Sequence, residues 1–271
     1  MRSSNPVFSS LTKTKNAAGR GYAGAGYEQA GYPTYGQPMG GYGAPAQTER
    51  AMTVDDVIAK TGITLGIIIA FAVLNFAIGM TVSMGISVLL TMVGAIGGLI
   101  AVLVGTLGKK YGSAAVTVIY AVFEGLFVGG FSLMIGGTNG ALIGQAVIAT
   151  IGVFVGMLWV YKAGVIRVTP KFTRFLTAAL VGVLFLSLGN LVSALLFDFN
   201  PLRGGGMMAI GFSLLCIVLA SLSFLQDFDV ADQLVRSGAP AKMAWGVALG
   251  LAVTLVWLYT EILRLLSILR N

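Results

Sequence analysis

The stretch Tyr120-Ala-Val-Phe-Glu-Gly-Leu-Phe-Val-Gly129 places one carboxylic acid, Glu124, near the middle of an apolar run over about 114–135. A run of that length is typical of a transmembrane helix. Glu124 would then lie near the bilayer midplane, where an ionised side chain costs about 2.5–3.5 kcal/mol on the insertion scale. No Lys or Arg lies in the middle of any apolar run to neutralise it. The sequence therefore predicts that Glu124 faces the interior of a helix bundle or a water-filled cavity.

The composition is that of an integral membrane protein. Of the 271 residues, 56% are hydrophobic and only 10% are charged, whereas about a quarter of the residues are charged in an ordinary soluble domain. Many of the 38 glycines lie inside the apolar runs, where small residues let membrane helices approach closely. The net charge of +7 does not indicate nucleic-acid binding, because the basic residues lie between the apolar runs.

The chain lacks residues that several classes of enzyme need. It has no histidine, which is the commonest metal ligand and the usual switch near neutral pH. An intramembrane metalloprotease needs histidine ligands, and a serine protease needs a His or Lys base at membrane depth. The single cysteine, Cys216, lies in an apolar run and is expected to be a small buried hydrophobe. We therefore expect neither an enzyme nor a bound cofactor or metal.

Residues 1–50 differ in composition from the rest of the chain. They carry a loose repeat that begins at Gly21-Tyr22, Gly26-Tyr27 and Gly31-Tyr32. Such a segment buries too little apolar area to offset the entropy lost on ordering, so a disordered cytoplasmic tail is predicted. Regularly spaced tyrosines also act as weak contacts for self-association, and this alternative stays open beside a simply solvated tail.

A helical domain is predicted at 52–271. Thr53 followed by Asp56 fits a capping box at its start. A hydropathy scan then predicts seven transmembrane segments, and the short joins between them favour antiparallel neighbours in an all-α bundle. The approximate bounds of the segments are 62–80, 85–107, 114–135, 140–161, 174–197, 207–226 and 243–263.

Basic residues lie at alternate joins between these segments. They precede the first segment, and they join the second to the third, the fourth to the fifth and the sixth to the seventh. The other joins are almost free of Lys and Arg, and Arg203 is the exception. Because basic residues stay on the cytoplasmic side of a membrane, the N-terminus is predicted to lie in the cytoplasm.

The last segment allows two topologies. Seven full spans place Arg264 and Arg270 outside, against the charge rule, whereas a re-entrant last segment returns them to the cytoplasm. Trp245 at one end, and Trp257 with Tyr259 at the other, look like aromatic residues at the two membrane interfaces. These aromatics favour a full span.

Several segments together carry a family resemblance. They are Asn5-Pro-Val-Phe-Ser9, the Tyr120–Gly129 stretch, Arg167-Val-Thr-Pro-Lys171, Gln226-Asp-Phe-Asp229 through Ser237-Gly-Ala-Pro240, and Trp257-Leu-Tyr-Thr-Glu261-Ile-Leu-Arg-Leu-Leu-Ser267. Over about residues 52–271 the chain resembles the Bax inhibitor / YccA family, and most of all its bacterial, actinomycete-type branch. The resemblance implies a seven-helix bundle whose last helix is surrounded by the other six. It also implies a pH-sensitive calcium leak, gated by two hydrogen-bonded acids on the last two helices.

The resemblance assigns the two gating acids to Asp227 and Glu261. The sequence departs from the family pattern in two ways: the second acid is Glu rather than Asp, and the gap between the two acids is wide. If the last segment spans fully, the two acids lie at opposite interfaces and cannot share a proton. The alternatives are that Asp227 couples to Glu124, and that Glu261 forms an ion pair with Arg264, three residues later on the same helix face.

Other polar residues extend the candidate site. Asp229 and Asp232 form either a cation vestibule next to Asp227 or a solvated segment that balances nearby basic residues. Asn75 and Asn190 lie at membrane depth, where they either line an ion pathway or hydrogen-bond across helices.

The leading hypothesis is a pH-sensitive passive cation channel for calcium in the bacterial cytoplasmic membrane. Glu124, Asn75 and Asn190 line its pathway, and deprotonation of Asp227 and Glu261 opens its gate by repulsion of like charges. The alternative is a regulatory protein without transport, which binds a membrane protease or an envelope-stress complex. The expected partners are the lipid bilayer, calcium or protons, and, under the alternative, a membrane protein.

Overall fold

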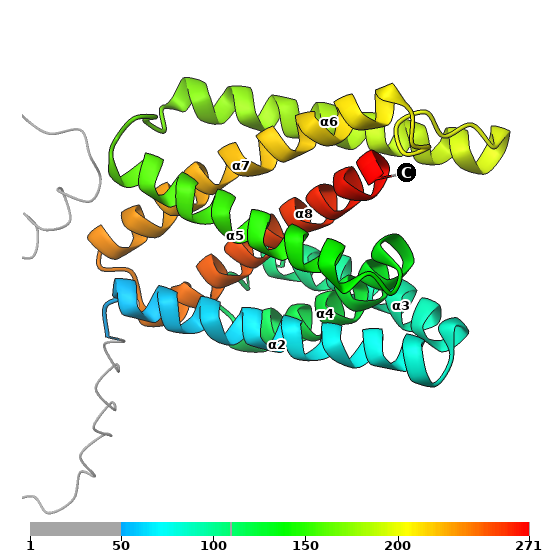
Figure 1. Ribbon diagram of the computed structural model, residues 1–271. Helices are drawn as coiled ribbons and strands as arrows, with labels where there is room; N and C mark the ends of the chain where they lie inside the picture. Colours follow the sequence, from blue (N-terminus) through cyan, green and yellow to red (C-terminus); the bar gives the residue numbers. More distant parts are fainter. Residues whose placement is uncertain (1–49, 109, 271) are drawn as a thin grey trace, which may run out of the picture. The chain divides into compact units, whose positions relative to one another are not determined.

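The computed structural model describes residues 50–108 and 110–270, and this part of the chain is helical (Figure 1). The predicted tail, apart from Arg50, lies outside the described residues. The long helices are α2 (Val54–Thr81), α3 (Met84–Thr106), α4 (Ala114–Gly136), α5 (Gly140–Lys162), α6 (Pro170–Phe197), α7 (Met207–Arg236) and α8 (Ala244–Arg270), with a short 3₁₀ helix, η1 (Ala241–Met243), before α8.

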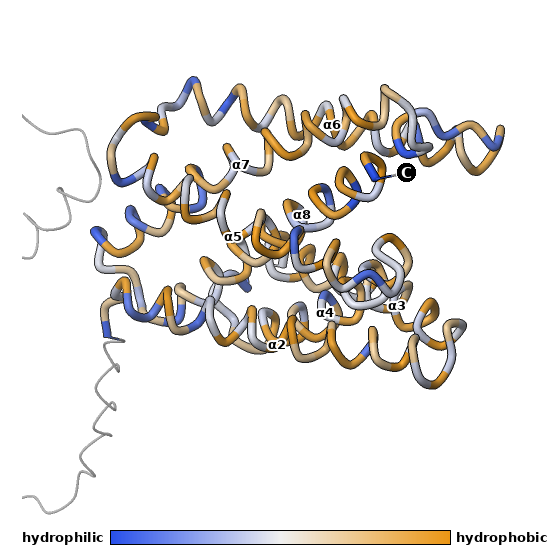
Figure 2. Tube along the Cα trace, in the orientation of Figure 1, coloured by the Kyte–Doolittle hydropathy of each residue, from blue (hydrophilic) through white to orange (hydrophobic). Residues whose placement is uncertain are grey.

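Within the described residues, seven helices are long and apolar enough to cross a membrane, which confirms the predicted bundle of seven spans. Their middle parts are hydrophobic, and the hydrophilic residues gather mostly near the helix ends (Figure 2). Helix α8 runs without a break for 27 residues, a length of about 40 Å. It is therefore long enough for a full span, and it has no break of the kind that a re-entrant segment needs.

The helices extend further than the hydropathy scan predicted. Helix α2 begins at Val54 rather than 62, because Thr53 and Asp56 form the predicted capping box. Helix α6 begins at Pro170 rather than 174, with Thr169 as its N-cap. A hydropathy window stops at charged residues, whereas a helix continues into the polar interface of the membrane. For the same reason α7 continues to Arg236, so the acidic cluster lies on a helix and not in a joining segment.

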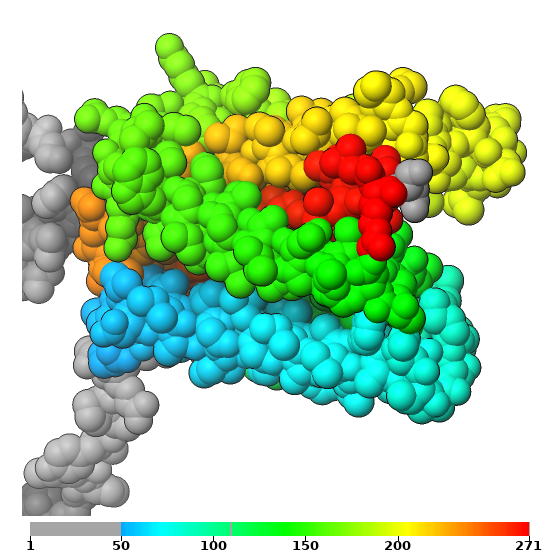
Figure 3. Space-filling model, in the orientation of Figure 1, coloured from blue at the N-terminus to red at the C-terminus, as the bar shows by residue number. Residues whose placement is uncertain are grey.

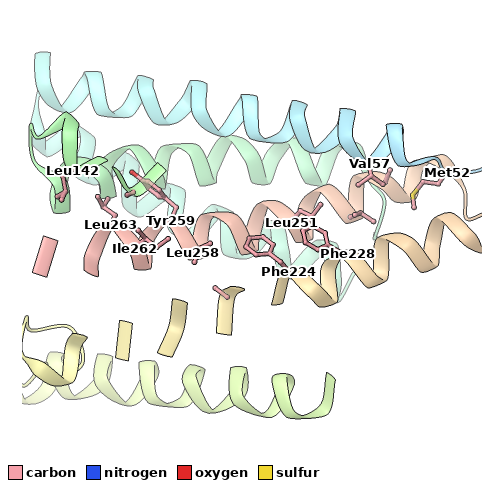
Figure 4. Close-up of a cluster of buried hydrophobic side chains, with 14 residues drawn as sticks. Met52, Val57, Leu142, Phe224, Phe228, Leu251, Leu258, Tyr259, Ile262 and Leu263 are labelled. Carbon is pink, nitrogen blue, oxygen red and sulfur yellow. The ribbon is translucent and has the colours of Figure 1, made fainter. Parts of the chain in front are cut away.

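Helix α8 lies at the centre of the bundle, as the family resemblance implied. In the last span 72% of the most apolar stretch is buried, against 11–44% in the other six spans. A cluster of buried hydrophobic residues follows α8 from end to end, with Met52 and Val57 toward one end and Leu142 and Tyr259 toward the other (Figure 4). A helix in this position has almost no side that faces lipid.

The chain crosses repeatedly between two ends of the bundle. The N-terminal end, where α2 begins, also carries the joins α3–α4, α5–α6 and α7–α8 (Figure 1). The C-terminal end, where α8 finishes, carries the joins α2–α3, α4–α5 and α6–α7. The basic joins predicted to be cytoplasmic therefore all lie at the N-terminal end.

Glycines bring α4 close to both α2 and α3. A Cβ atom at Gly129 would lie 2.2 Å from the carbonyl oxygen of Ala72 on α2, and one at Gly125 would lie 2.6 Å from that of Ile68. On the other side, a Cβ at Gly94 of α3 would lie 2.5 Å from a backbone oxygen of α4. Such contacts allow close van der Waals packing between helices, which drives helix association in a membrane.

This packing predicts that Gly129→Ala lowers the free energy of unfolding by about 1–3 kcal/mol, because the new methyl group overpacks the contact with α2. The measurement is thermal unfolding in detergent. Gly152→Ala on α5 is the matched control, since nothing lies within 4 Å of its added Cβ, and alanine favours a helix by up to about 1 kcal/mol over glycine. Equal melting temperatures for the two variants would contradict the prediction.

Candidate functional site

A cavity of about 380 Å³ lies beside the central helix. It is lined by side chains of α3, α4 and α8 and by the segment that joins α6 to α7. Four charged residues line it, namely Glu124, Arg203, Glu261 and Arg264. The cavity therefore brings Glu124 of α4 and Arg203 of the α6–α7 join together with Glu261 and Arg264 of α8.

Glu124 faces this cavity, as the sequence predicted, and its half-buried side chain lies opposite α3. A Cβ atom at Gly98 would lie 2.6 Å from the Oε2 atom of Glu124, so a glycine is needed there to make room for the carboxyl group. Within residues 50–108 and 110–270, no side chain or backbone group is hydrogen-bonded to that carboxyl group. The carboxyl group thus lies at the cavity wall, beside Gly98 of α3.

Glu261 and Arg264 form an ion pair on α8, one turn apart. The two residues are only 4% and 7% exposed. Arg264 also donates from Nε to the hydroxyl of Ser213 on α7, at 3.4 Å. A buried charge must be paired and hydrogen-bonded, and this pair meets that requirement at membrane depth.

Asp227 has a different partner on the central helix. The hydroxyl of Thr254 donates to its Oδ2 atom at 2.7 Å. Tyr111, in the α3–α4 join, lies near this pair, since burial first and then the charge of Asp227 raise the pKa of the tyrosine above its ordinary value. This cluster lies toward the N-terminal end of the bundle.

The structure does not bring Asp227 and Glu261 together. Helices α7 and α8 run antiparallel from a short join, so residues late in α7 face residues early in α8. Thr254, the partner of Asp227, lies two turns before Glu261, a rise of about 10 Å. Glu261 instead faces the start of α7 and is paired with Arg264. The hydrogen-bonded acid pair is not formed, and the alternative ion pair is.

The profile of the family described as Bax inhibitor 1 like matches residues 5–271. The chain belongs to this family. No curated protein matches its sequence. Membership of the Bax inhibitor 1 like family agrees with the seven spans and with the central position of the last helix in the structure.

An apolar layer of buried side chains borders the cavity of this Bax inhibitor 1 like protein, and Tyr120 and Val256 belong to both the layer and the cavity lining. Its buried residues come from α2, α3, α4 and α8 and are Ile68, Ala101, Tyr120, Ala121, Leu249, Ala252 and Val256. Asp227 lies against Gly250 and Thr254 of α8, at the same level of that helix as the layer residues Leu249, Ala252 and Val256.

The two asparagines predicted at membrane depth hold helices and joins in place. Asn75 is fully buried and donates from Nδ2 to the carbonyl oxygen of Leu126 at 2.6 Å and to the hydroxyl of Thr91 at 3.1 Å. It therefore connects α2 with α3 and α4. Asn190 donates to the side chain of Asn200 and accepts from the backbone N–H of Leu202. Neither asparagine lines the cavity that holds Glu124.

Asp229 and Asp232 make local contacts on α7, and Asp232 also accepts a hydrogen bond from the hydroxyl of Tyr161 on α5, at 3.4 Å. Gln233 donates to Asp229 at 2.6 Å, and Arg236 forms an ion pair with Asp232 at 2.9 Å. Across the described part of the chain, no group of three His, Cys, Asp or Glu side chains could hold a metal ion. The local contacts agree with the solvated alternative, in which these acids balance nearby basic residues.

Arg203 lines the cavity, although the sequence did not lead us to propose it as a site residue. It lies in the α6–α7 join, which Asn190 anchors through the neighbouring residue Leu202. The signal was present in the sequence, because Arg203 is the one basic residue that breaks the alternating pattern of the joins. A charge that departs from a topology pattern indicates a structural or functional role.

The buried ion pair predicts that Glu261→Gln lowers the free energy of unfolding by about 3–5 kcal/mol, because Arg264 is left buried without a counter-charge. The double variant Glu261→Gln/Arg264→Gln should lose less free energy of unfolding than the sum of the losses in the two single variants. Thermal unfolding of the wild type and the three variants in detergent measures this coupling. Additive losses would show that the pair contributes no interaction energy.

Proposed function

We propose that this protein is a passive, pH-sensitive cation pathway, with calcium as its main ion, and that Glu124 is its ion-binding group. The observation that carries the proposal is the carboxyl group of Glu124, which faces a cavity at membrane depth without a hydrogen-bond partner among the described residues. Carboxylate oxygen is the ligand that calcium prefers in proteins. Ionisable groups inside a membrane are costly, and they mark ion or proton pathways.

The charges around the cavity support a role for Glu124 rather than Glu261. Glu261 is neutralised by Arg264 on its own helix. The remaining acid is Glu124 and the remaining base is Arg203. A cation in the cavity is attracted by the ionised form of Glu124 and repelled by Arg203, so the protonation of one acid decides the net charge that an ion meets.

The apolar layer beside Tyr120 supports a closed state of the pathway. A cation that leaves the cavity past Tyr120 and Val256 would have to pass between the packed apolar side chains of this layer, and an apolar constriction without water blocks ions. Opening therefore requires that α8 moves relative to α3 and α4, which carry the other side of the layer. Asp227 accepts a hydrogen bond from Thr254 on α8, so such a movement would also change the surroundings of this acid.

We also propose the orientation that the basic joins indicate. The N-terminal end of the bundle faces the cytoplasm of a bacterium, and the cavity with Glu124 and Arg203 belongs to the outer half of the cytoplasmic membrane. In this orientation the pathway lets calcium run down its gradient into the cell. No enzymatic step is part of this function.

Calcium flux into liposomes tests the role of Glu124 over a range of about pH 6 to 8, since a carboxylate binds cations and a neutral carboxylic acid does not. The groups that face Glu124 are Tyr120 on its own helix, Arg203 from the α6–α7 join, and Glu261 and Arg264 from α8. Flux should rise with pH as Glu124 loses its proton. Glu124→Gln should lower flux at the upper pH by about tenfold, the effect of about 1.4 kcal/mol of lost cation stabilisation.

The control for this experiment is Asp229→Asn, which removes an acid that bonds locally on α7. It should leave the flux and its pH dependence unchanged. A flux that is absent in the wild type would overturn the proposal and favour the regulatory alternative, in which the protein binds a membrane partner without transport.

Arg203→Gln should raise calcium flux by about fivefold, because it removes about 1 kcal/mol of repulsion at the cavity. The same liposome assay measures this change. Arg174→Gln, in the first turn of α6, removes a positive charge that does not line the cavity and should have no such effect. Equal flux in the two variants would assign Arg203 a role in the fold alone.

A further inference from the structure

A second cavity, here named the α2–α5 groove, also borders the central helix. It has a volume of about 500 Å³ and is lined by side chains of α2, α4, α5 and α8. Leu255, Val256 and Tyr259 of α8 form its floor, and its walls include Ala72 of α2 and Val147 of α5. The residues contributed by α4 and α5 come from the parts of these helices nearest the C-terminal end of the bundle, and those contributed by α2 come from the middle of that helix.

The groove opens between α2 and α5 toward the lipid-facing surface. Ile69 and Val73 of α2 are each 62% exposed, and Val147 and Ile151 of α5 are 41% and 55% exposed. Helix α2 packs mainly on α3, α4 and α8, whereas α5 packs mainly on α7 and α8, so a seam remains between α2 and α5 (Figure 3). Since both helices are long and apolar enough to cross a membrane, this seam adjoins lipid hydrocarbon.

The chemistry of the lining excludes water as the occupant. The side-chain hydroxyl groups in the groove are those of Ser132, Thr150 and Tyr259. The Ser132 and Tyr259 hydroxyls are hydrogen-bonded to each other at 2.7 Å, and Thr150 donates to the carbonyl oxygen of Ala146 on its own helix. A buried water needs two to four polar partners, and a cavity lined by apolar groups stays dry.

We propose that the α2–α5 groove binds one acyl chain of a membrane phospholipid. The groove is apolar, is continuous with the lipid-facing surface and lies at the depth of the hydrocarbon, where acyl chains are the abundant apolar ligand. A chain in the groove contacts Leu255 and Tyr259 of α8, which lipid around the bundle does not reach because the other helices cover α8. It also contacts Val256, which lines the Glu124 cavity as well. The chain therefore packs against the same turn of the central helix that borders the charged cavity.

Photo-crosslinking tests this proposal on the full-length protein. The probe is a phosphatidylglycerol with a diazirine midway along one acyl chain, in vesicles of phosphatidylethanolamine and phosphatidylglycerol. Mass spectrometry should find the label on Leu255 or Tyr259 of α8 in the wild type. Label confined to outward-facing residues, such as Phe185 of α6, which is 67% exposed, would overturn the proposal, because lipid around the bundle produces that pattern without a groove.

Two matched variants on α5 sharpen the test. Val147→Phe fills the groove, whereas Val155→Phe adds the same ring two turns later on the same helix, at a residue that is 56% exposed and does not line the groove. The ratio of label on α8 to label on α6 should fall severalfold in Val147→Phe and stay unchanged in Val155→Phe. An equal ratio in the two variants would overturn the proposal. If Val147→Phe fails to fold in gel filtration, the position of the label in the wild type decides alone.

Discussion

The cost of a charge in hydrocarbon is the constraint on which this structure depends. An ionised side chain that faces lipid is expensive, so charges at membrane depth need a position that other helices cover. Helix α8 has that position and carries Thr254, Tyr259, Glu261 and Arg264. The six surrounding helices cover α8 and keep lipid away from these polar groups.

The surrounding helices are not all packed equally tightly. Glycines let α2, α3 and α4 approach until backbone atoms nearly touch, and Asn75 adds hydrogen bonds that join all three. Helix α6, by contrast, packs mainly on α7 and is the least buried of the spans. Glu124 therefore belongs to the tightly packed part of the bundle, and Arg203 belongs to a join beside its loosely packed part. A movement of α6 and α7 would change the distance between these two charges without unfolding the first three spans.

The proposals of an ion pathway and of an acyl-chain site meet at one turn of α8. Val256 lines both cavities, one of which gathers charged side chains and the other of which is apolar. The hydrogen bond between Tyr259 and Ser132 joins that turn to α4, the helix that carries Glu124. Under these proposals, an acyl chain on one side of the central helix and an ion on the other both contact α8. Binding of lipid in the groove would therefore affect the cavity through the position of α8.

The sequence by itself determined the seven spans, the capping box at Thr53 and Asp56, the family, and the acid Glu124 as a group that faces a cavity. These features depend on local properties, namely hydropathy, capping chemistry and the length of apolar runs. The tertiary structure decided the partners of the polar groups. Asp227 faces Thr254 because α7 and α8 run antiparallel from a short join, whereas the family resemblance implied that Asp227 pairs with Glu261. Which side chains meet depends on the rotation and depth of each helix relative to its neighbours, and a hydropathy pattern carries no information about either.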